Sequence, residues 1–215
     1  MANTLTGDKI KGLVEEGKVI ENGSMKNCGS LKYDFTLSDG ILKSDFNAPV
    51  HITELSVEGR RKALIQPGEV VYVLTKEKVN LPEDMYMSLS ANRSMSEYGV
   101  LTLGGFAVDP GYSGKLMFGL FNYSSTPFAL IPGTKLIGGV FYQLSEDESV
   151  NVKEFELPKT IDEFPARLIS IISKFSPIGM TSMEESINTI SKQIAAIKEE
   201  INRNKDELFS LRHLV

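Results

Sequence analysis

The C-terminal stretch of the sequence, residues 183–215, carries the most regular pattern in the chain. Its seam positions alternate steps of four and three residues, which is the heptad spacing of a coiled coil. These positions are Met183, Ile187, Ile190, Ile194, Ile197, Ile201, Asn204, Leu208, Leu211 and Val215. A helix built from this stretch has to bury a narrow apolar stripe against other helices or against its own domain.

The residue types in this stripe favour an assembly of more than two chains. Ile187 takes an a position and Ile190 a d position, and isoleucine at both positions favours trimers or tetramers over dimers. Asn204 at a d position would fix the register at some cost in stability. A long helix lying on its own domain is the alternative, although such helices normally show a wider apolar face. We therefore expect a trimerising coiled-coil helix over 181–215.

Between residues 30 and 145 the pattern changes to short runs rich in Val, Leu, Phe and Tyr. Turn signals separate these runs, and many short strands with such punctuation predict a mainly β sandwich or barrel. The signals are Ser38-Asp39-Gly40, Pro67-Gly68, Leu81-Pro82-Glu83-Asp84, Asp109-Pro110-Gly111 and Pro132-Gly133. A short amphipathic helix is expected before this block, capped at Thr6 or Asp8 and stopped at Gly17.

A further helical pattern follows Pro158. Phe164, Leu168, Ile171, Ile172 and Phe175 recur at helical spacing, and Ser176-Pro177-Ile178-Gly179 should end the helix. The expected organisation is a β domain over 1–157, a helix and connector over 158–180, and the coiled coil over 181–215.

Charge and residue usage exclude several classes of protein. The formal net charge is -5, with 28 acidic and 23 basic residues, so the overall field opposes a nucleic acid. Cys28 is the single cysteine and only two histidines exist, which excludes an internal disulfide framework and a Cys/His zinc site. No stretch approaches the roughly 20 apolar residues of a membrane span. We expect a soluble cytoplasmic protein without nucleic-acid or membrane partners.

Two short motifs have residue types that could carry chemistry. Arg93-Ser94 sets a planar guanidinium beside a hydroxyl, a pairing that suits phosphate, although such a pair is usually a solvated surface feature. Asp109-Pro110-Gly111-Tyr112-Ser113-Gly114 holds a carboxylate and an aromatic ring in one tight turn, although an ordinary hairpin turn reads the same way. Neither motif decides a function alone.

Taken in order, these motifs resemble those of the dCTP deaminase and dUTPase superfamily over residues 5 to 145. The N-terminal stretches are similar to the helix and strand that open dCTP deaminases, and Tyr33–Leu37 is similar to the family's Tyr-Asp-Leu-x-Leu strand. The resemblance implies a dUTPase-like distorted β-barrel or jelly-roll with an N-terminal helix. The matching stretches are Leu5–Ile10, Glu16–Ile20, Tyr33–Leu37, Pro67–Val71 and Leu81–Asp84.

The resemblance also assigns roles to individual residues. Arg93 and Ser94 correspond to the phosphate-binding motif of a pocket formed between two subunits. Asp109 corresponds to the aspartate that orients the hydrolytic water, and Tyr112 to the aromatic that packs on the deoxyribose. Asn122 corresponds to an asparagine of the base-binding hairpin, and Lys135 belongs to the late motif that closes the sheet, Pro132–Ile137.

The sequence departs from the deaminase pattern at the acid–base position. The glutamate with which deaminases of this family shuttle protons falls on Gly119, which has no proton to transfer. Glu97 occupies the place of a second arginine, Met95 interrupts the Arg-Ser-Ser motif, and the Gly-rich C-terminal arm of dUTPases is absent. Deamination of dCTP is therefore improbable, although the nearby Glu97 prevents absolute exclusion.

Two readings remain open. The first is a dUTP diphosphatase, with Mg²⁺ on the substrate phosphates and active sites at the interfaces of a homotrimer. The second is a catalytically inactive nucleotide-binding or interaction protein on the same fold, possessing a coiled coil for partner contact. Sequence alone does not identify the base that is bound.

Overall fold

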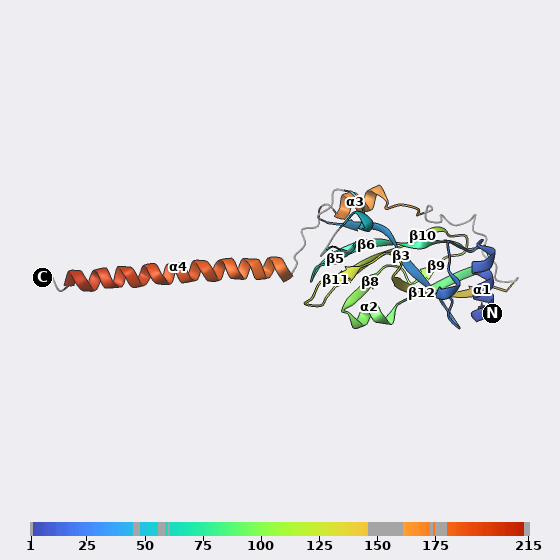
Figure 1. Ribbon diagram of the computed structural model, residues 1–215, viewed down its shortest axis with the longest axis horizontal. Coiled ribbons are helices and arrows are strands. Elements are labelled where there is room, and N and C mark those ends of the chain that lie inside the picture. The colour runs from blue at the N-terminus through green and yellow to red at the C-terminus, as the bar shows by residue number, and fades with distance from the viewer. Residues whose placement is uncertain are drawn as a thin grey trace. The chain divides into compact units, whose positions relative to one another are not determined.

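The computed structural model describes residues 2–44, 48–55, 59, 61–145, 161–172, 174 and 180–212. The chain divides into two compact units, Met1–Pro177 and Ile178–Val215, and each is described by itself. The first unit holds the strands and the short helices, and the second holds one long helix (Figure 1).

The first unit is mainly β, as expected. Its strands are β1 (Asn3–Thr4), β2 (Ile20–Glu21), β3 (Tyr33–Lys43), β4 (Val50–His51), β5 (Ala63–Ile65), β6 (Val70–Asn80), β7 (Met85–Ala91), β8 (Val100–Leu103), β9 (Ala107–Val108), β10 (Ser113–Asn122), β11 (Phe128–Leu130) and β12 (Lys135–Gln143). Its helical elements are α1 (Gly7–Glu16), η1 (Met25–Asn27), η2 (Ile52–Glu54), α2 (Arg93–Glu97) and α3 (Ala166–Ile172).

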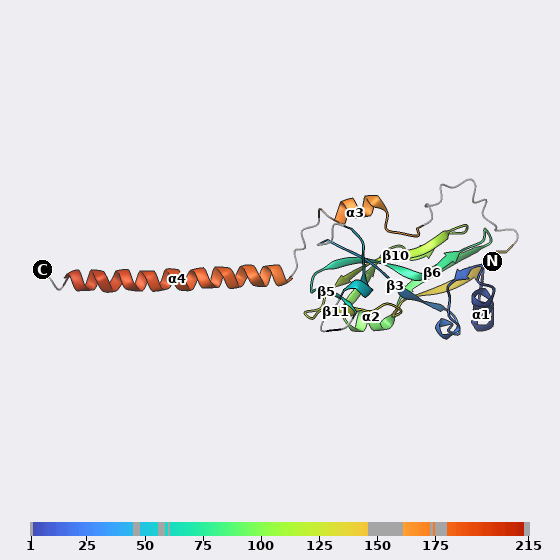
Figure 2. The same ribbon diagram turned by 45° about the horizontal axis from the view of Figure 1, so that its top comes forward.

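Antiparallel pairing joins most of these strands into one curled sheet (Figures 1 and 2). Its main path runs β8-β10-β6-β3-β12-β7-β9, and β5 pairs with β11 in a separate ribbon. The inner face carries the core, which includes the fully buried Phe35, Ile41, Val73 and Phe141. The expected distorted half-barrel with an N-terminal helix is thereby confirmed.

Helix α1 has the boundaries that its sequence predicts. Thr6 is the N-cap residue, and its carbonyl accepts from the amides of Lys9 and Ile10. Gly17 ends the helix in the left-handed conformation, with φ of 64°, which glycine adopts without a steric penalty. Ile10 is fully buried, so the helix closes one end of the core.

A buried carboxylate ties β3 to β6. Glu77 is 1% exposed, and its oxygens accept from the amide of Thr36 at 2.8 Å, the hydroxyl of Thr36 at 2.9 Å and the hydroxyl of Tyr33 at 3.2 Å. Burial raises the pKa of Tyr33 to about 12, so its hydroxyl stays a proton donor at neutral pH. Because a buried charge has to be compensated, these donors fix the pairing of the two strands.

Helix α3 covers part of the outer face of the sheet (Figure 2). Phe164 and Ile172 pack there against Leu42 and Leu74. The helix begins at Ala166, later than the predicted pattern, because the residue before Pro165 is disfavoured in helical conformation. Phe175 and the expected break at 176–179 lie outside the described residues.

The second unit contains α4 (Met180–Arg212), a helix of 33 residues. The expected C-terminal helix is thus confirmed, whereas its assembly as a coiled coil stays a prediction. Every side chain described on it, over 185–205, is exposed, including the five seam isoleucines from Ile187 to Ile201. Among the described residues no helix combines the length and the apolar character needed to cross a membrane.

Candidate functional site

The turn between β9 and β10 carries Asp109 and Tyr112. The amide of Tyr112 donates to the carbonyl of Asp109 at 3.2 Å, and Gly111 has a φ of 79°, which explains the glycine. Leu81 anchors the turn through two backbone hydrogen bonds. Its amide donates to the carbonyl of Tyr112 at 2.8 Å, and its carbonyl accepts from the amide of Gly111 at 3.0 Å. The turn is therefore held against the β6–β7 connection, and the Asp109 side chain lies at the surface.

Asp109 and Tyr112 together line a pocket of about 270 Å³. Among the described residues that line it, Asp109 is the one carboxylate, and the others are glycine and apolar side chains apart from Tyr112. The other lining residues are Leu89, Gly105, Ala107, Val108, Leu116, Met117, Phe118 and Ile161. A single carboxylate at an apolar pocket is an arrangement that can position one water beside a bound group.

Tyr112 forms a wall of this pocket and stays neutral. It is 7% exposed, and its hydroxyl donates to the carbonyl of Lys115 in a short hydrogen bond. Burial, and to a lesser extent the negative charge of Asp162, raises the pKa of Tyr112 to about 12. The ring therefore presents a rigid, uncharged surface, which suits packing against a sugar.

A segment that the sequence did not assign to the site completes the pocket. The carbonyl of Ile161 accepts from the amide of Lys115 at 2.6 Å, and Asp162 pairs with Lys78 at 3.2 Å. Gly114 allows this approach, since a Cβ there would lie 2.7 Å from the Ile161 amide nitrogen. Of residues 161–164, only Phe164 entered a predicted pattern, that of a helix. No local sequence signal therefore placed Ile161 beside Tyr112.

Arg93 and Ser94 begin the short helix α2. The Asn92 side chain caps this helix by accepting from the Ser94 amide at 3.3 Å, and Met95 anchors it in the core. Arg93 is 91% exposed, and its Nε lies 2.8 Å from Oε1 of Glu97, one turn later. The arginine that the sequence resemblance predicts to bind phosphate therefore pairs with Glu97, which stands at the position where the resemblance places a second arginine.

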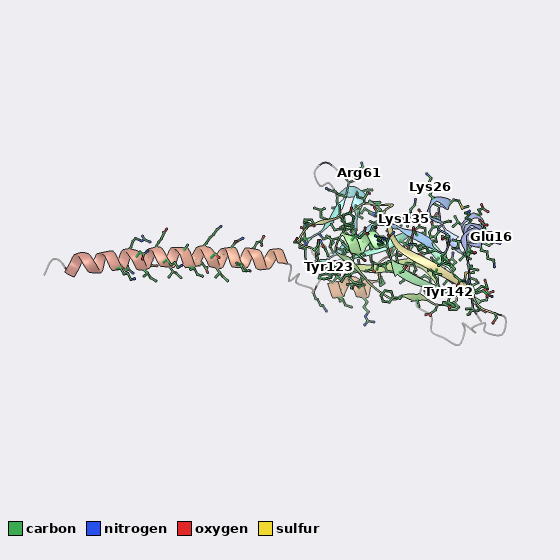
Figure 3. All side chains as sticks on the ribbon, turned by 90° about the horizontal axis from the view of Figure 1, so that it is seen from below. Glu16, Lys26, Arg61, Tyr123, Lys135 and Tyr142 are labelled. Carbon is green, nitrogen blue, oxygen red and sulfur yellow. The ribbon has the colours of Figure 1, made fainter. Side chains whose placement is uncertain are left out.

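Lys135 lies at the same end of the sheet as Arg93. β12 pairs with β7 through Ile137 and Ala91, and the amide of Asn92 donates to the carbonyl of Leu136 at 3.2 Å. Lys135 and Tyr142 mark the two ends of β12 in Figure 3. The structure thus gathers Arg93, Ser94 and Lys135 around one end of the β7–β12 pair.

Asp34 holds Lys135 and Lys32 together. The Nζ of Lys135 lies 3.0 Å from one Asp34 oxygen, and the Nζ of Lys32 lies 2.8 Å from the other. Partial burial would raise the pKa of Asp34, but hydrogen bonds from Lys32 and Lys135 and their charges outweigh it, and the pKa is lowered. Two ammonium groups around one carboxylate leave this surface with an excess positive charge.

The two sets of predicted residues occupy opposite ends of β7. Val108, the residue before Asp109, pairs with Met87 near the start of β7, whereas Arg93 follows its last residue, Ala91. A strand of seven residues is about 20 Å long. One chain therefore holds the predicted residues in two separate clusters, which we call half-sites: one with Asp109 and Tyr112, the other with Arg93, Ser94 and Lys135.

Asn122 belongs to neither half-site. It is fully buried, and its amide nitrogen donates to the carbonyls of Ile65 at 2.9 Å and Thr126 at 2.8 Å. Its oxygen accepts from the amide and the hydroxyl of Ser124. With donor and acceptor both engaged, Asn122 shapes the turn after β10 instead of reaching the pocket that Asp109 lines.

Gly119 is packed too closely to accommodate a side chain freely. A Cβ there would lie 3.1 Å from the Cβ of Leu103 and 3.4 Å from the Tyr72 ring. Gly119 pairs directly with both residues, on β8 and β6, and does not line the Asp109 pocket. At the position where the resemblance places a glutamate, β10 therefore packs closely against β6 and β8.

The described residues provide no cage for a metal ion. Over the described part of the chain no group of three or more His, Cys, Asp or Glu side chains is placed to hold one. A larger cavity of about 690 Å³ lies beside β4 and α3, lined in part by Asp39, His51 and Glu163, and it contains none of the predicted site residues. A cation at the Asp109 pocket would fit only as one that arrives with ligand phosphates.

Comparison with known proteins finds relatives among the dCTP deaminases. The chain is 28% identical over 157 residues to a dUMP-forming dCTP deaminase of Dictyoglomus thermophilum, covering 66% of this chain and 80% of the relative. It is 40% identical over 84 residues to a dUMP-forming dCTP deaminase of Kocuria rhizophila, covering 38% and 43%. In several relatives of this kind the match spans about half of the relative's length.

The fold has a counterpart among solved structures. A 2'-deoxycytidine 5'-triphosphate deaminase from Agrobacterium tumefaciens superposes with a TM-score of 0.56 at 18% identity, over 71% of this chain and 54% of that one. Residues 4–144 match the family model described as dCTP deaminase-like. That match includes both half-sites and spans well over half of the sequence. The chain therefore belongs to the dCTP deaminase-like family.

Proposed function

We propose that this protein is a dUTP diphosphatase, which converts dUTP and water into dUMP and pyrophosphate. The observation that carries the proposal is the pocket of about 270 Å³ with Asp109 as its single carboxylate and Tyr112 as a neutral wall. A pocket of this kind can hold a deoxynucleoside while one carboxylate faces the attached phosphate.

In the proposed reaction Asp109 orients a water for attack on the α-phosphorus. The water proton passes to the carboxylate, a new bond forms between water oxygen and phosphorus, and the bond to the bridging oxygen of the β-phosphate breaks. Pyrophosphate leaves with that oxygen. Positioning of the nucleophile supplies the main rate gain in such displacements.

The phosphates need cationic groups, which Asp109's own half-site does not contain. Arg93, Ser94 and Lys135 supply a guanidinium, a hydroxyl and an ammonium, but at the other end of β7. We therefore place the complete site between two subunits of a homotrimer, with one half-site from each. Each trimer would then hold its sites at the subunit boundaries.

A divalent cation such as Mg²⁺ fits this site as a companion of the phosphates. Bound to the phosphate oxygens, it would neutralise charge that develops on the leaving pyrophosphate. From this chain, Asp109 is the carboxylate near enough to the pocket to contact such an ion or its water.

Deamination of dCTP fits the chain less well than hydrolysis. Gly119 stands at the position that the resemblance gives to the proton-transferring glutamate. A Cβ added at Gly119 would lie 3.1 Å from the Cβ of Leu103. Proton transfer between water, base and departing ammonia needs a titratable group within hydrogen-bond reach. The Asp109 carboxylate is the one such acid in the pocket wall.

The test is pyrophosphate release by the purified full chain with dUTP and Mg²⁺. Asp109→Asn should reduce release by at least about a hundredfold, since it removes the group that orients the water. Asp8→Asn is the matched control, because Asp8 is exposed on α1 and does not line the pocket. A wild type as inactive as Asp109→Asn would end the proposal.

The ion pair between Arg93 and Glu97 favours a second candidate function. An arginine already bound to an acid offers less charge to a triphosphate, and Asn122 is engaged by backbone carbonyls. Under this alternative the protein binds a nucleotide without turnover and acts as an interaction protein. Calorimetric binding of dUTP, combined with the absence of pyrophosphate, would support it over hydrolysis.

A further inference from the structure

Helix α4 presents an apolar stripe that nothing described in this chain covers. Ile187, Ile190, Ile194, Ile197 and Ile201 are 49–60% exposed and recur at a and d positions along the helix. A run of five isoleucines along one stripe is an interaction surface in need of a partner, because isolated surface isoleucines do not recur with heptad spacing.

The charges that flank the stripe identify both the partner and its direction. In this heptad Glu200 takes a g position and Lys198 and Lys205 take e positions. In parallel, in-register helices a g residue faces the e residue five positions later in the neighbour, so Glu200 meets Lys205 of another copy. Gln193 and Lys198 form the corresponding polar pair one heptad earlier, and the sequence repeats the acid–base order with Glu207 and Arg212.

An antiparallel arrangement would oppose these charges. Antiparallel helices set g positions against g positions and e against e. Acidic Glu200 would then lie near other acids, and Lys198 and Lys205 near other bases. The pattern therefore discriminates against antiparallel pairing, as well as against an unrelated helix without complementary charges.

We infer that α4 binds the α4 helices of other copies of this chain in a parallel, in-register coiled coil. Isoleucine at both a and d favours three or four copies, and three is the number that the proposed trimeric site requires; the direction of the helices does not rest on the proposed function. Parallel helices gather the N-terminal ends of α4 at one place. The β units joined to them are thereby kept at high effective concentration, which favours completion of the half-sites.

A cysteine placed at one end of α4 tests the direction. In the full chain carrying Cys28→Ser, Ile187→Cys sits at an a position near the N-terminal end of the helix, where only a parallel partner presents the same residue. Mild oxidation should give a covalent dimer on a denaturing gel. Glu185→Cys, two residues earlier at an outward f position, is the control and should stay monomeric. An Ile187→Cys protein that stays monomeric would overturn the inference.

Charge reversal tests the pairing itself. In the Ile187→Cys background, the equilibrium yield of the disulfide in a glutathione buffer reports how firmly the helices associate. Glu200→Lys should lower the effective concentration of the thiols about tenfold through three lost pairs, and adding Lys205→Glu should restore it. Glu199→Lys makes the same charge change at the neighbouring f position and should have no such effect. Failure of the double variant to recover would refute parallel pairing.

Both measurements are made without nucleotide. An inactive protein that still forms the disulfide would refute only the proposed hydrolysis, whereas an active protein without it would refute only the coiled coil.

Discussion

The Nε of Arg93 lies 2.8 Å from Oε1 of Glu97 across one turn of α2. Both side chains are mostly exposed, at 91% and 56%. Exposed pairs of this spacing contribute only about 0.3–0.5 kcal/mol, far less than a charged hydrogen bond to phosphate. Under the proposed function, a phosphate group would therefore displace Glu97, and the pair would weaken binding without preventing it.

Glu97→Gln should strengthen nucleotide binding. Removing the competing carboxylate and its repulsion of phosphate is expected to lower the Kd for dUTP about two- to fivefold, as measured by calorimetry. Arg93→Ala should raise the Kd at least about tenfold. Glu16→Gln, which changes an exposed residue of α1, is the control for charge removal and should leave the Kd unchanged. An unchanged Kd for Glu97→Gln would show that Arg93 does not contact the phosphates.

Gly119→Ala should destabilise the β8–β10 pair. The added Cβ would lie 3.1 Å from the Leu103 Cβ, so the strands have to separate by a few tenths of an ångström. We expect the free energy of unfolding to fall by about 1 kcal/mol in a denaturant titration. In a Leu103→Gly background the same change should cost less, which a double-mutant cycle measures.

Gly104→Ala, at the residue directly after β8, serves as the control. Its nearest neighbour, Cδ1 of Phe118, would be at 3.4 Å, an ordinary contact, and we expect a change within about 0.5 kcal/mol. Equal costs for Gly119→Ala and Gly104→Ala would remove the close-packing explanation.

Gly114→Ala should displace the segment that completes the pocket. Gly114 has a φ of 155°, and a Cβ there would lie 2.7 Å from the Ile161 amide nitrogen and 2.9 Å from its carbonyl oxygen. We expect a loss of about 2 kcal/mol or more in the free energy of unfolding, because neither backbone atom can rotate away. Differential scanning calorimetry provides the measurement.

Gly12→Ala is the opposite case within the same protein. Gly12 lies in α1 with nothing within 4 Å of the added Cβ. The substitution should raise the free energy of unfolding by about 0.5–1 kcal/mol, since alanine favours a helix over glycine. A Gly114→Ala protein that is as stable as wild type would show that the contact with Ile161 does not form.

Asp34→Asn should produce a stability difference that depends on pH. Because the folded state lowers the pKa of Asp34, its ionised form is favoured by folding and its contribution is fully present at neutral pH. The contribution is lost as the pH falls below about 4, where the carboxylate is protonated. The gap between wild type and variant should thus be largest near neutral pH and shrink in acid.

Denaturant titrations at neutral pH and in acid measure this gap. Asp8→Asn is the control, since its carboxylate is 99% exposed and lies on α1. A gap for Asp34→Asn that stays constant with pH would mean that Lys32 and Lys135 do not favour the charged form.

Local sequence patterns predicted the elements of this protein well. Thr6 and Gly17 bound α1, and the heptad from Met183 to Leu211 lies in one continuous helix. Four of the five turn signals separate strands, but the turn predicted at Ser38-Asp39-Gly40 is wrong: these residues lie inside β3, where its pairing with β6 is irregular. Each of these depends on interactions within a few residues: a cap, a left-handed glycine, or a repeat that follows the helical period. The helical pattern after Pro158 included Phe164, but α3 begins at Ala166, because Pro165 disfavours a helical conformation for the residue before it.

The predicted site could be listed from the sequence, but its arrangement could not. The sequence motifs indicated Asp109, Tyr112, Arg93 and Lys135 as site residues. Their spacing along the chain did not show that they form two half-sites at opposite ends of β7. Asn122 matched a motif, yet its hydrogen bonds to Ile65 and Thr126 are formed within the fold.

By itself, then, the sequence determined the mainly β character, the helix boundaries at Thr6 and Gly17, and the stripe that α4 presents. Only the tertiary structure decided that Ile161 closes the pocket beside Tyr112 and that Leu103 packs against Gly119. Helical repeats and turns arise from neighbours along the chain, whereas these contacts join strands and segments that are distant in sequence. Their geometry depends on the register and curl of the whole sheet.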